Sequence, residues 1–114
     1  MAKERGSRDR QRHEATVSKK SEAKIGGGRV PIRDEESRVP VDDLQEIKNL
    51  ARVRVGGGIT KRAGGEFEFV RVDISIEWPC EPNKEAVKKT YKRLSSMVDT
   101  MIEDELAYAE DRMD

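Results

Sequence analysis

The clearest pattern in the chain is an alternation of apolar and polar residues between positions 70 and 78. Every second position there is apolar: Val70, Val72, Ile74, Ile76 and Trp78. A period of two puts one set of side chains on a buried face and the other in solvent, so it predicts a β-strand. Pro79 ends this strand because proline cannot donate to a ladder. Phe67 and Phe69 have the opposite parity, so either a bulge precedes the strand or both rings pack on its other face.

A second, shorter alternation precedes this strand. Val53 and Val55 alternate with arginines, and the glycine run 56–58 then interrupts the pattern as a bulge or a mobile segment. Gly64 and Gly65 supply a turn signal, because glycine adopts the positive φ that a tight hairpin needs. The two alternations therefore predict an antiparallel β-hairpin over about residues 51–78.

The C-terminal part has the spacing of an amphipathic helix. Asn83 is a suitable N-cap, and neither glycine nor proline occurs after Pro82. Apolar residues then follow in steps of three and four: Val87, Tyr91, Leu94, Val98 and Met101, with Met97, Ile102, Leu106 and Ala109 widening the stripe. This pattern predicts one long helix over about residues 83–110. We expect Ile74, Ile76 and Leu94 to be buried where the helix meets the hairpin.

The N-terminal part lacks such periodicity. The whole chain is 40% charged and only 34% hydrophobic, and residues 1–30 contain no aromatic residue. Such a composition buries too little apolar surface to offset the entropy of ordering. We therefore expect a disordered basic arm and linker over residues 1–41 and one folded domain over residues 42–114. Asp42 or Asp43 can cap a short helix there, with Leu44, Ile47 and Leu50 on one face.

Together these elements predict an α+β fold. It consists of an antiparallel β-hairpin packed on one long C-terminal amphipathic helix, with a disordered N-terminal arm.

Candidate catalytic chemistry is sparse. The only histidine, His13, lies in the arm, and the only cysteine, Cys80, fits a small apolar residue at a strand–helix corner. The glycine run 56–58 lacks the Gly-Lys-Ser/Thr step of a phosphate-binding loop. Carboxylates near the C-terminus, including Glu103, Asp104 and Glu105, point to several helix faces and fit a solvated acidic surface rather than a metal site. We expect no enzymatic activity, no metal and no cofactor.

Positive and negative charges are segregated although they cancel overall. Residues 1–30 carry nine basic and four acidic side chains. Such a segment either contacts nucleic-acid phosphates through charge or serves as a solubilising tail. The first third of the long helix is also basic, which suits a polyanion as well. The candidate nucleic-acid-binding residues are therefore Arg5, Arg8, Arg10, Arg12, Lys19, Lys20, Lys88 and Lys92.

The helix also suggests self-association. A two-stranded hairpin of about nine residues per strand spans only about 30 Å, which is shorter than the predicted helix. We therefore expect a homodimer whose interface contains Val98, Met101, Ile102 and Leu106. From Asp99 onward the helix carries seven acids and one arginine, so its charges oppose the macrodipole. This charge pattern is either unselected or has a function. An antiparallel partner helix would turn this cost into attraction.

The stretch from Val70 to Leu106 resembles small uncharacterised proteins of phages and other mobile elements. The shared features are the strand, the corner Pro79-Cys80 and a helix that contains Glu85, Thr90-Tyr91, Leu94, Val98 and Glu105-Leu106. The resemblance implies a phage-like origin and a small accessory role, and it carries no activity.

Three functions fit this reading. The first is a non-catalytic accessory protein that associates with nucleic acid, DNA or RNA, or with its processing machinery. The second is an inhibitor or adaptor, such as an anti-defence factor, that binds a host or phage protein. The third is a virion assembly component. No stretch approaches the ~20 apolar residues of a membrane span. We expect a cytoplasmic protein, in the host cell if it is phage-encoded.

Overall fold

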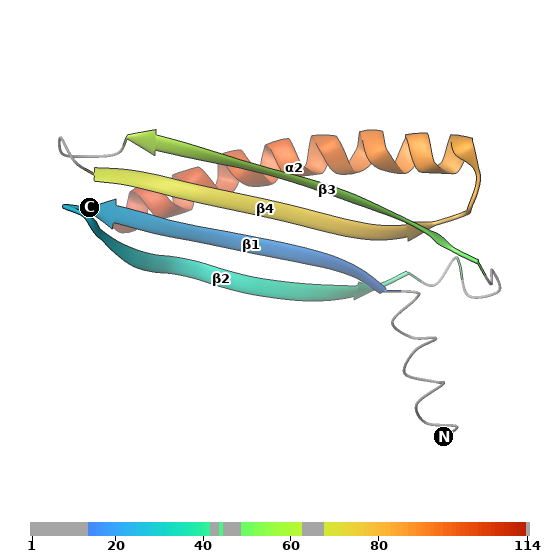
Figure 1. Ribbon diagram of the computed structural model, residues 1–114, viewed down its shortest axis with the longest axis horizontal. Helices are drawn as coiled ribbons and strands as arrows, with labels where there is room; N and C mark the ends of the chain where they lie inside the picture. The colour runs from blue at the N-terminus through green and yellow to red at the C-terminus, as the bar shows by residue number, and fades with distance from the viewer. Residues whose placement is uncertain (1–13, 42–43, 45–48, 63–67, 114) are drawn as a thin grey trace, which may run out of the picture.

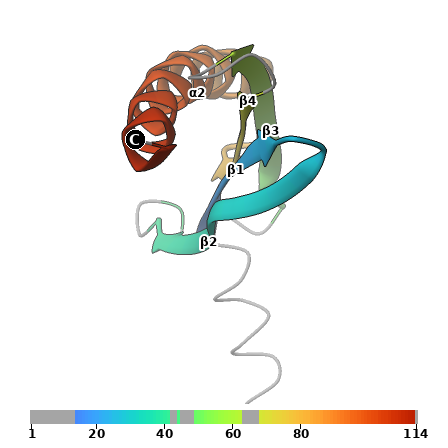
Figure 2. The same cartoon turned by 90° about the vertical axis from the view of Figure 1, so that its left-hand side faces the viewer.

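The computed structural model describes residues 14–41, 44, 49–62 and 68–113. Its elements are β1 (Glu14–Ile25), β2 (Gly28–Pro40), β3 (Ala51–Arg62), β4 (Glu68–Cys80) and α2 (Lys84–Met113) (Figure 1). The strands form one antiparallel sheet in the order β2-β1-β4-β3. The single long helix lies on one face of this sheet (Figures 1 and 2). The predicted α+β fold is confirmed, and β3 with β4 is the predicted hairpin.

The sheet is larger than the sequence predicted, because residues 14–40 are not a disordered arm and linker. They form β1 and β2, and β1 is hydrogen-bonded to β2 on one side and to β4 on the other. Gly26 and Gly27 make the turn between them, with φ of 56° and 88°. The buried side chains of β1 are small, namely Ala15, Ser21 and Ala23. Residues of this size leave almost no hydrophobic signal in the sequence.

Other predictions fall on parts of the chain that are not described. Residues 1–13 of the expected arm and most of the short helix expected near residues 42–50 lie outside the described residues.

The core lies between α2 and the alternating face of β4. Val70, Val72, Ile74 and Ile76 line this face, and Leu94 of α2 packs against them. The predicted burial of Ile74, Ile76 and Leu94 is confirmed, with exposed fractions of 2%, 0% and 0%. Asn83 caps the helix as predicted, because its Oδ1 accepts a hydrogen bond of 2.8 Å from the Ala86 amide.

The strands are long enough to cover the helix from end to end. β4 has 13 residues, or about 43 Å, and α2 has 30 residues, or about 45 Å. The strands beneath α2 therefore cover more of the apolar stripe than a hairpin of about nine residues per strand would. Val98 is only 3% exposed, so it belongs to the core and not to a surface. Met101, Ile102 and Leu106 are half-buried against the same core.

The glycine run 56–58 lies inside β3 and lets α2 approach the sheet. A Cβ at Gly57 would meet Ile102 Cδ1 at 3.2 Å and Val98 Cγ1 at 3.4 Å. Gly56 faces the other side of the sheet, where its nearest neighbour would be the Ile74 carbonyl oxygen at 3.5 Å. Glycine is therefore needed at position 57 for helix packing and is not needed for this purpose at position 56.

We predict that Gly57→Val lowers the free energy of unfolding by about 1–3 kcal/mol, because the added methyl groups overpack the contact with α2. Gly56→Val is the matched control. It should leave stability within about 0.5 kcal/mol or raise it, since valine is favoured in strands. Urea unfolding of both variants measures the difference, and equal losses would contradict this packing.

Leu94→Ala should destabilise the protein by about 2–5 kcal/mol, because it leaves a cavity between α2 and β4. Thermal or urea unfolding monitored by circular dichroism checks this value. A loss below about 0.5 kcal/mol would mean that Leu94 does not fill the core.

Candidate functional site

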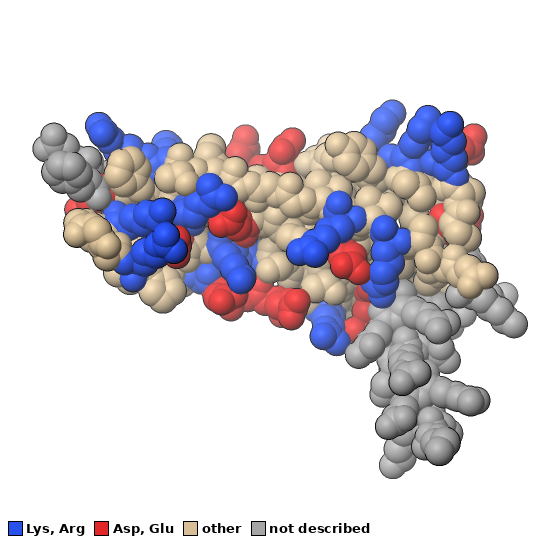
Figure 3. Space-filling view, in the orientation of Figure 1, with Lys and Arg blue, Asp and Glu red and all other residues tan. Residues whose placement is uncertain are grey.

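The sheet has an open face, defined here as the face that α2 does not cover. On β4 this face carries Phe69, Arg71, Asp73, Ser75 and Glu77, which alternate with the core residues. Figure 3 looks onto this face, and Lys and Arg side chains gather densely at the end where the β1–β2 turn lies. A charged sheet face of this kind is the most extensive chemical feature of the described surface.

Two arginines of the open face are neutralised by neighbours. Arg71 pairs with Asp73 at 2.8 Å, and Arg52, at the Cys80 end of the face, pairs with Glu77 at 3.0 Å. The hydrogen bond and the charge of Asp73 raise the pKa of the Arg71 guanidinium above its ordinary value, although burial opposes this. Gly58 leaves room for the Arg71–Asp73 pair, because a Cβ there would collide with Asp73 Oδ1.

The end of the face near the β1–β2 turn is different. A single row crosses all four strands there, and it consists of Arg29, Lys24, Phe69 and Arg62. Lys24 lies opposite both Arg29 and Phe69, and Phe69 lies opposite Arg62. The Arg62 guanidinium carbon lies 5.9 Å from the centre of the Phe69 ring. We call these four residues the cationic row, since they align three cations with one aromatic ring and contain no acid.

The cationic row is electrostatically uncompensated. Like charges directly opposite each other on neighbouring strands are unfavourable, and Lys24 and Arg29 are such a pair. In the described part of the chain, neither residue makes an ion pair. Arg29 and Arg62 are exposed, while Lys24 and Phe69 are half-buried. Strands about 4.8 Å apart make the row about 14 Å wide. Such a row can attract an extended anion by charge.

The structure does not bring the predicted nucleic-acid-binding residues together. Lys20 lies on the open face opposite Asp73 and Asp34, whereas Lys19 has the opposite parity and lies opposite Ile74. Lys88 and Lys92 are exposed on α2, on the other side of the sheet. Arg5, Arg8, Arg10 and Arg12 lie outside the described residues.

The cationic row is not apparent from the sequence alone. Lys24 and Arg29 are two of the nine basic residues of the first 30, and no local pattern marks Arg62. The one usable signal was the parity of Phe69, which left open that its ring packs on the other face. The structure shows that this alternative is right for Phe69, while Phe67 lies outside the described residues.

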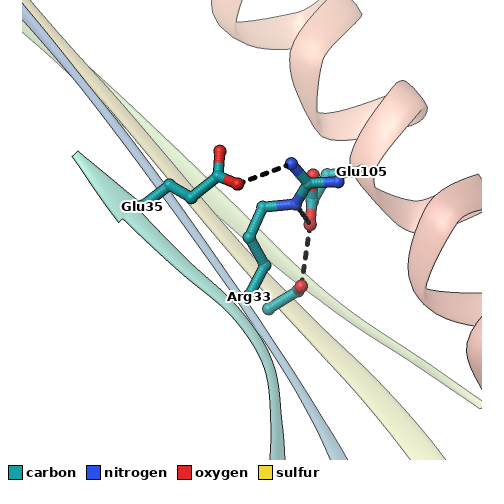
Figure 4. A network of polar contacts seen from close by, with 4 residues as sticks. Arg33, Glu35 and Glu105 are labelled. Atoms are coloured by element: carbon teal, nitrogen blue, oxygen red, sulfur yellow. Dashed lines mark hydrogen bonds and ion pairs between the residues drawn. The ribbon is translucent and has the colours of Figure 1, made fainter. Parts of the chain in front are cut away.

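A polar network holds the edge strand β2 to α2 (Figure 4). Glu105 is only 4% exposed, so the expectation that it belongs to a solvated acidic surface is wrong. Its Oε2 accepts hydrogen bonds from Ser21 Oγ at 2.8 Å and from Arg33 Nε at 3.0 Å. Arg33 also donates to Glu35 at 3.1 Å. Its guanidinium lies 3.9 Å from the centre of the Tyr108 ring.

This network keeps a buried carboxylate satisfied. Burial opposes the charge of Arg33, but the hydrogen bond to Glu35 and the charges of Glu105 and Glu35 raise the pKa of its guanidinium above the ordinary value. A charged donor therefore faces Glu105 throughout the physiological range. Since α2 packs mainly on β3 and β4, this contact fixes β2 and, through it, the position of Arg29.

Other chemistry finds no support in the described part of the chain. Cys80 is a free cysteine and is buried at the end of β4. Among the described residues no group of three or more His, Cys, Asp and Glu side chains converges as metal ligands would. The described helix lacks the apolar length needed to cross a bilayer. No protein family, curated protein or solved structure matches this chain, so the resemblance to phage proteins stays a prediction.

We predict that Glu105→Ala costs about 1–3 kcal/mol of stability, because it leaves buried hydrogen-bond donors without an acceptor. Glu35→Ala is the matched control, since it removes the exposed partner of the same guanidinium and should cost less than about 1 kcal/mol. Hydrogen exchange should show faster exchange of β2 amides in Glu105→Ala alone. Unchanged β2 protection in this variant would mean that the network does not anchor the strand.

Proposed function

We propose that this protein binds single-stranded nucleic acid on the open face of its sheet, with the cationic row as the contact. The observation that carries the proposal is the row itself, in which Lys24 and Arg62 flank Phe69 and Arg29 follows Lys24, without an acidic residue in the same row. Cations alone suit any polyanion. An aromatic ring among them suits a polyanion that carries bases, because every base has a face that stacks on such a ring.

The shape of the site favours a single strand over a duplex. The row is about 14 Å wide, whereas the major groove of B-DNA is about 12 Å wide and admits a helix or a two-stranded ribbon. A four-stranded sheet therefore does not enter the groove. Bases in a duplex are also stacked on each other, so they cannot stack on Phe69 unless they are unpaired. The expected activity is binding, with no chemical step.

Each residue of the row has a distinct role in this proposal. Phe69 stacks one base, and Lys24 and Arg62 hold the phosphates on either side of it, since they flank the ring on β1 and β3. Arg29 extends the contact to the edge strand. The basic residues expected to contact phosphate before residue 13 remain candidates for a further, sequence-independent contribution.

Fluorescence anisotropy with labelled single-stranded and duplex oligonucleotides of DNA and RNA tests the proposal. We expect Phe69→Ala to weaken single-strand binding by about 1–3 kcal/mol and to leave the salt dependence unchanged, because stacking releases no counterions. Phe69→Trp should retain binding. Equal affinity for duplex and single strand, or no effect of Phe69→Ala, would refute stacking on this ring.

The electrostatic contribution has its own matched pair of variants. Lys24→Glu should weaken binding and reduce the magnitude of the slope of log K against log salt by about 0.7, the value for one phosphate contact of a single strand. Lys89→Glu changes the net charge equally, but this exposed lysine lies on α2, away from the open face. Equal weakening by both variants would assign binding to net charge, and stronger weakening by Lys88→Glu with Lys92→Glu would assign it to the helix.

A further inference from the structure

The two edges of the sheet differ in how well they are protected against pairing. β2 contains Pro31 and Pro40, which have no backbone N–H to donate. The pairing of β2 with β1 also shifts in register between Ser21 and Glu22 of β1. Proline and bulges are the usual means of blocking an exposed edge. β3 has neither, because residues 51–62 contain no proline and pair with β4 without a shift. Among the described residues, no strand other than β4 pairs with β3, so its outer edge has the features of an edge that accepts another strand.

The surface beside this edge is partly apolar. Ile59 of β3 is 40% exposed, and Tyr91 of α2 is 56% exposed. Ile102 and Leu106, on the flank of α2 that lies over β3, are only half-buried. The position of this flank is fixed by two contacts, namely Ile102 beside Gly57 and the 2.9 Å ion pair between Glu110 and Lys61. Backbone donors and apolar side chains are thus available together.

We propose that a second copy of this chain pairs its β3 antiparallel with β3, around a two-fold axis through Gly57 that is normal to the sheet. Such an axis keeps both helices on the same side of the joined sheet. The helix-facing residues of one β3 then lie opposite the helix-facing residues of the other. It places Val55 opposite Ile59 of the second copy and Gly57 opposite Gly57. The two apolar side chains then form cross-strand pairs, and no side chain obstructs the centre. The product is a continuous eight-stranded sheet.

The two helices would lie close to each other in this arrangement. α2 packs comparably on β3 and β4 and crosses the strands obliquely, so its axis lies about half a strand spacing inside β3 where Ile102 is beside Gly57. With strands about 4.8 Å apart, the two-fold mate of α2 lies about 10 Å away. Packed helices are commonly 8–10 Å apart, so the two helices meet as antiparallel neighbours. Tyr91, Ile102 and Leu106 then lie between them.

The charges of α2 are complementary in the same arrangement. At helical spacing one stripe on the β3 flank reads Lys88, Lys92, Ser95, Asp99, Ile102, Leu106 and Glu110. Its first part is basic and its last part is acidic, which is unfavourable for an isolated helix because it opposes the macrodipole. Antiparallel pairing places the basic part of each helix beside the acidic part of the other. Self-complementarity of this kind identifies a second copy, rather than a different protein, as the occupant.

This dimer does not depend on nucleic-acid binding, because the β3 edge and the α2 flank lie apart from the cationic row's aromatic centre. It would nevertheless join two open faces side by side. Arg62 would then lie opposite Arg52 of the second copy, whose charge Glu77 already compensates.

Light scattering on the full chain over a range of concentrations tests the dimer. We expect twice the monomer mass of 13.0 kDa at high concentration. Ile59→Lys should weaken the dimer about tenfold or more, since it puts a charge into the central apolar pairs. Val30→Lys is the matched control on the β2 edge, where Val30 is 51% exposed, and it should have no effect. Both positions are exposed, so circular dichroism should show a native fold in both variants.

Charge reversal tests the antiparallel helices separately. Lys88→Glu with Lys92→Glu should weaken the dimer, more so at low salt, and the further change Glu110→Lys should restore it, because Glu110 of one helix lies beside Lys88 and Lys92 of the other in this arrangement. A concentration-independent mass of 13.0 kDa would overturn the dimer. A dimer that Val30→Lys dissociates and Ile59→Lys does not would overturn the choice of edge. A dimer indifferent to the charge reversals would overturn the antiparallel helices.

Discussion

Packing of α2 against the alternating face of β4 is the contact on which the other features of the protein depend. Leu94 and Val98 fill the space above Ile74 and Ile76, and Gly57 lets the helix approach the neighbouring strand. Because one helix satisfies one face of the sheet, the second face is left to solvent. The same contact fixes the parity of every strand, since a shift by one residue would exchange the two faces. Core packing therefore determines which charged residues share the open face.

The outer half of the sheet is held by polar contacts as much as by apolar ones. β1 buries alanines and a serine, which give little hydrophobic stabilisation compared with the valines and isoleucines of β4. Glu105 compensates for this, because it receives Ser21 from β1 and Arg33 from β2 at one oxygen. A buried carboxylate with specific donors also fixes geometry, which a smooth apolar contact does not. The position of Arg29 at the end of the cationic row follows from this anchoring.

The proposed functions use two surfaces that share only β3, which carries Arg62 of the cationic row. The cationic row lies on the open face, where its charges cannot be compensated by the helix on the other side of the sheet. The β3 edge and the adjacent flank of α2 are available for a second copy. Pairing of these edges would extend the open face without covering it, so binding and self-association are compatible.

The amino-acid sequence by itself determined the parts of this protein that depend on local periodicity. The alternation from Val70 to Trp78, the cap at Asn83 and the spacing around Leu94 are visible within single segments, and the structure confirms all three. Tertiary structure alone decided the rest. Whether residues 14–40 form strands depends on β4, which pairs with β1 from about 50 residues further along the chain. The burial of Val98 and Glu105 depends on how many strands lie beneath α2. The cationic row likewise joins residues 24, 29, 62 and 69 through strand register, and register is set by pairing between distant segments rather than by composition.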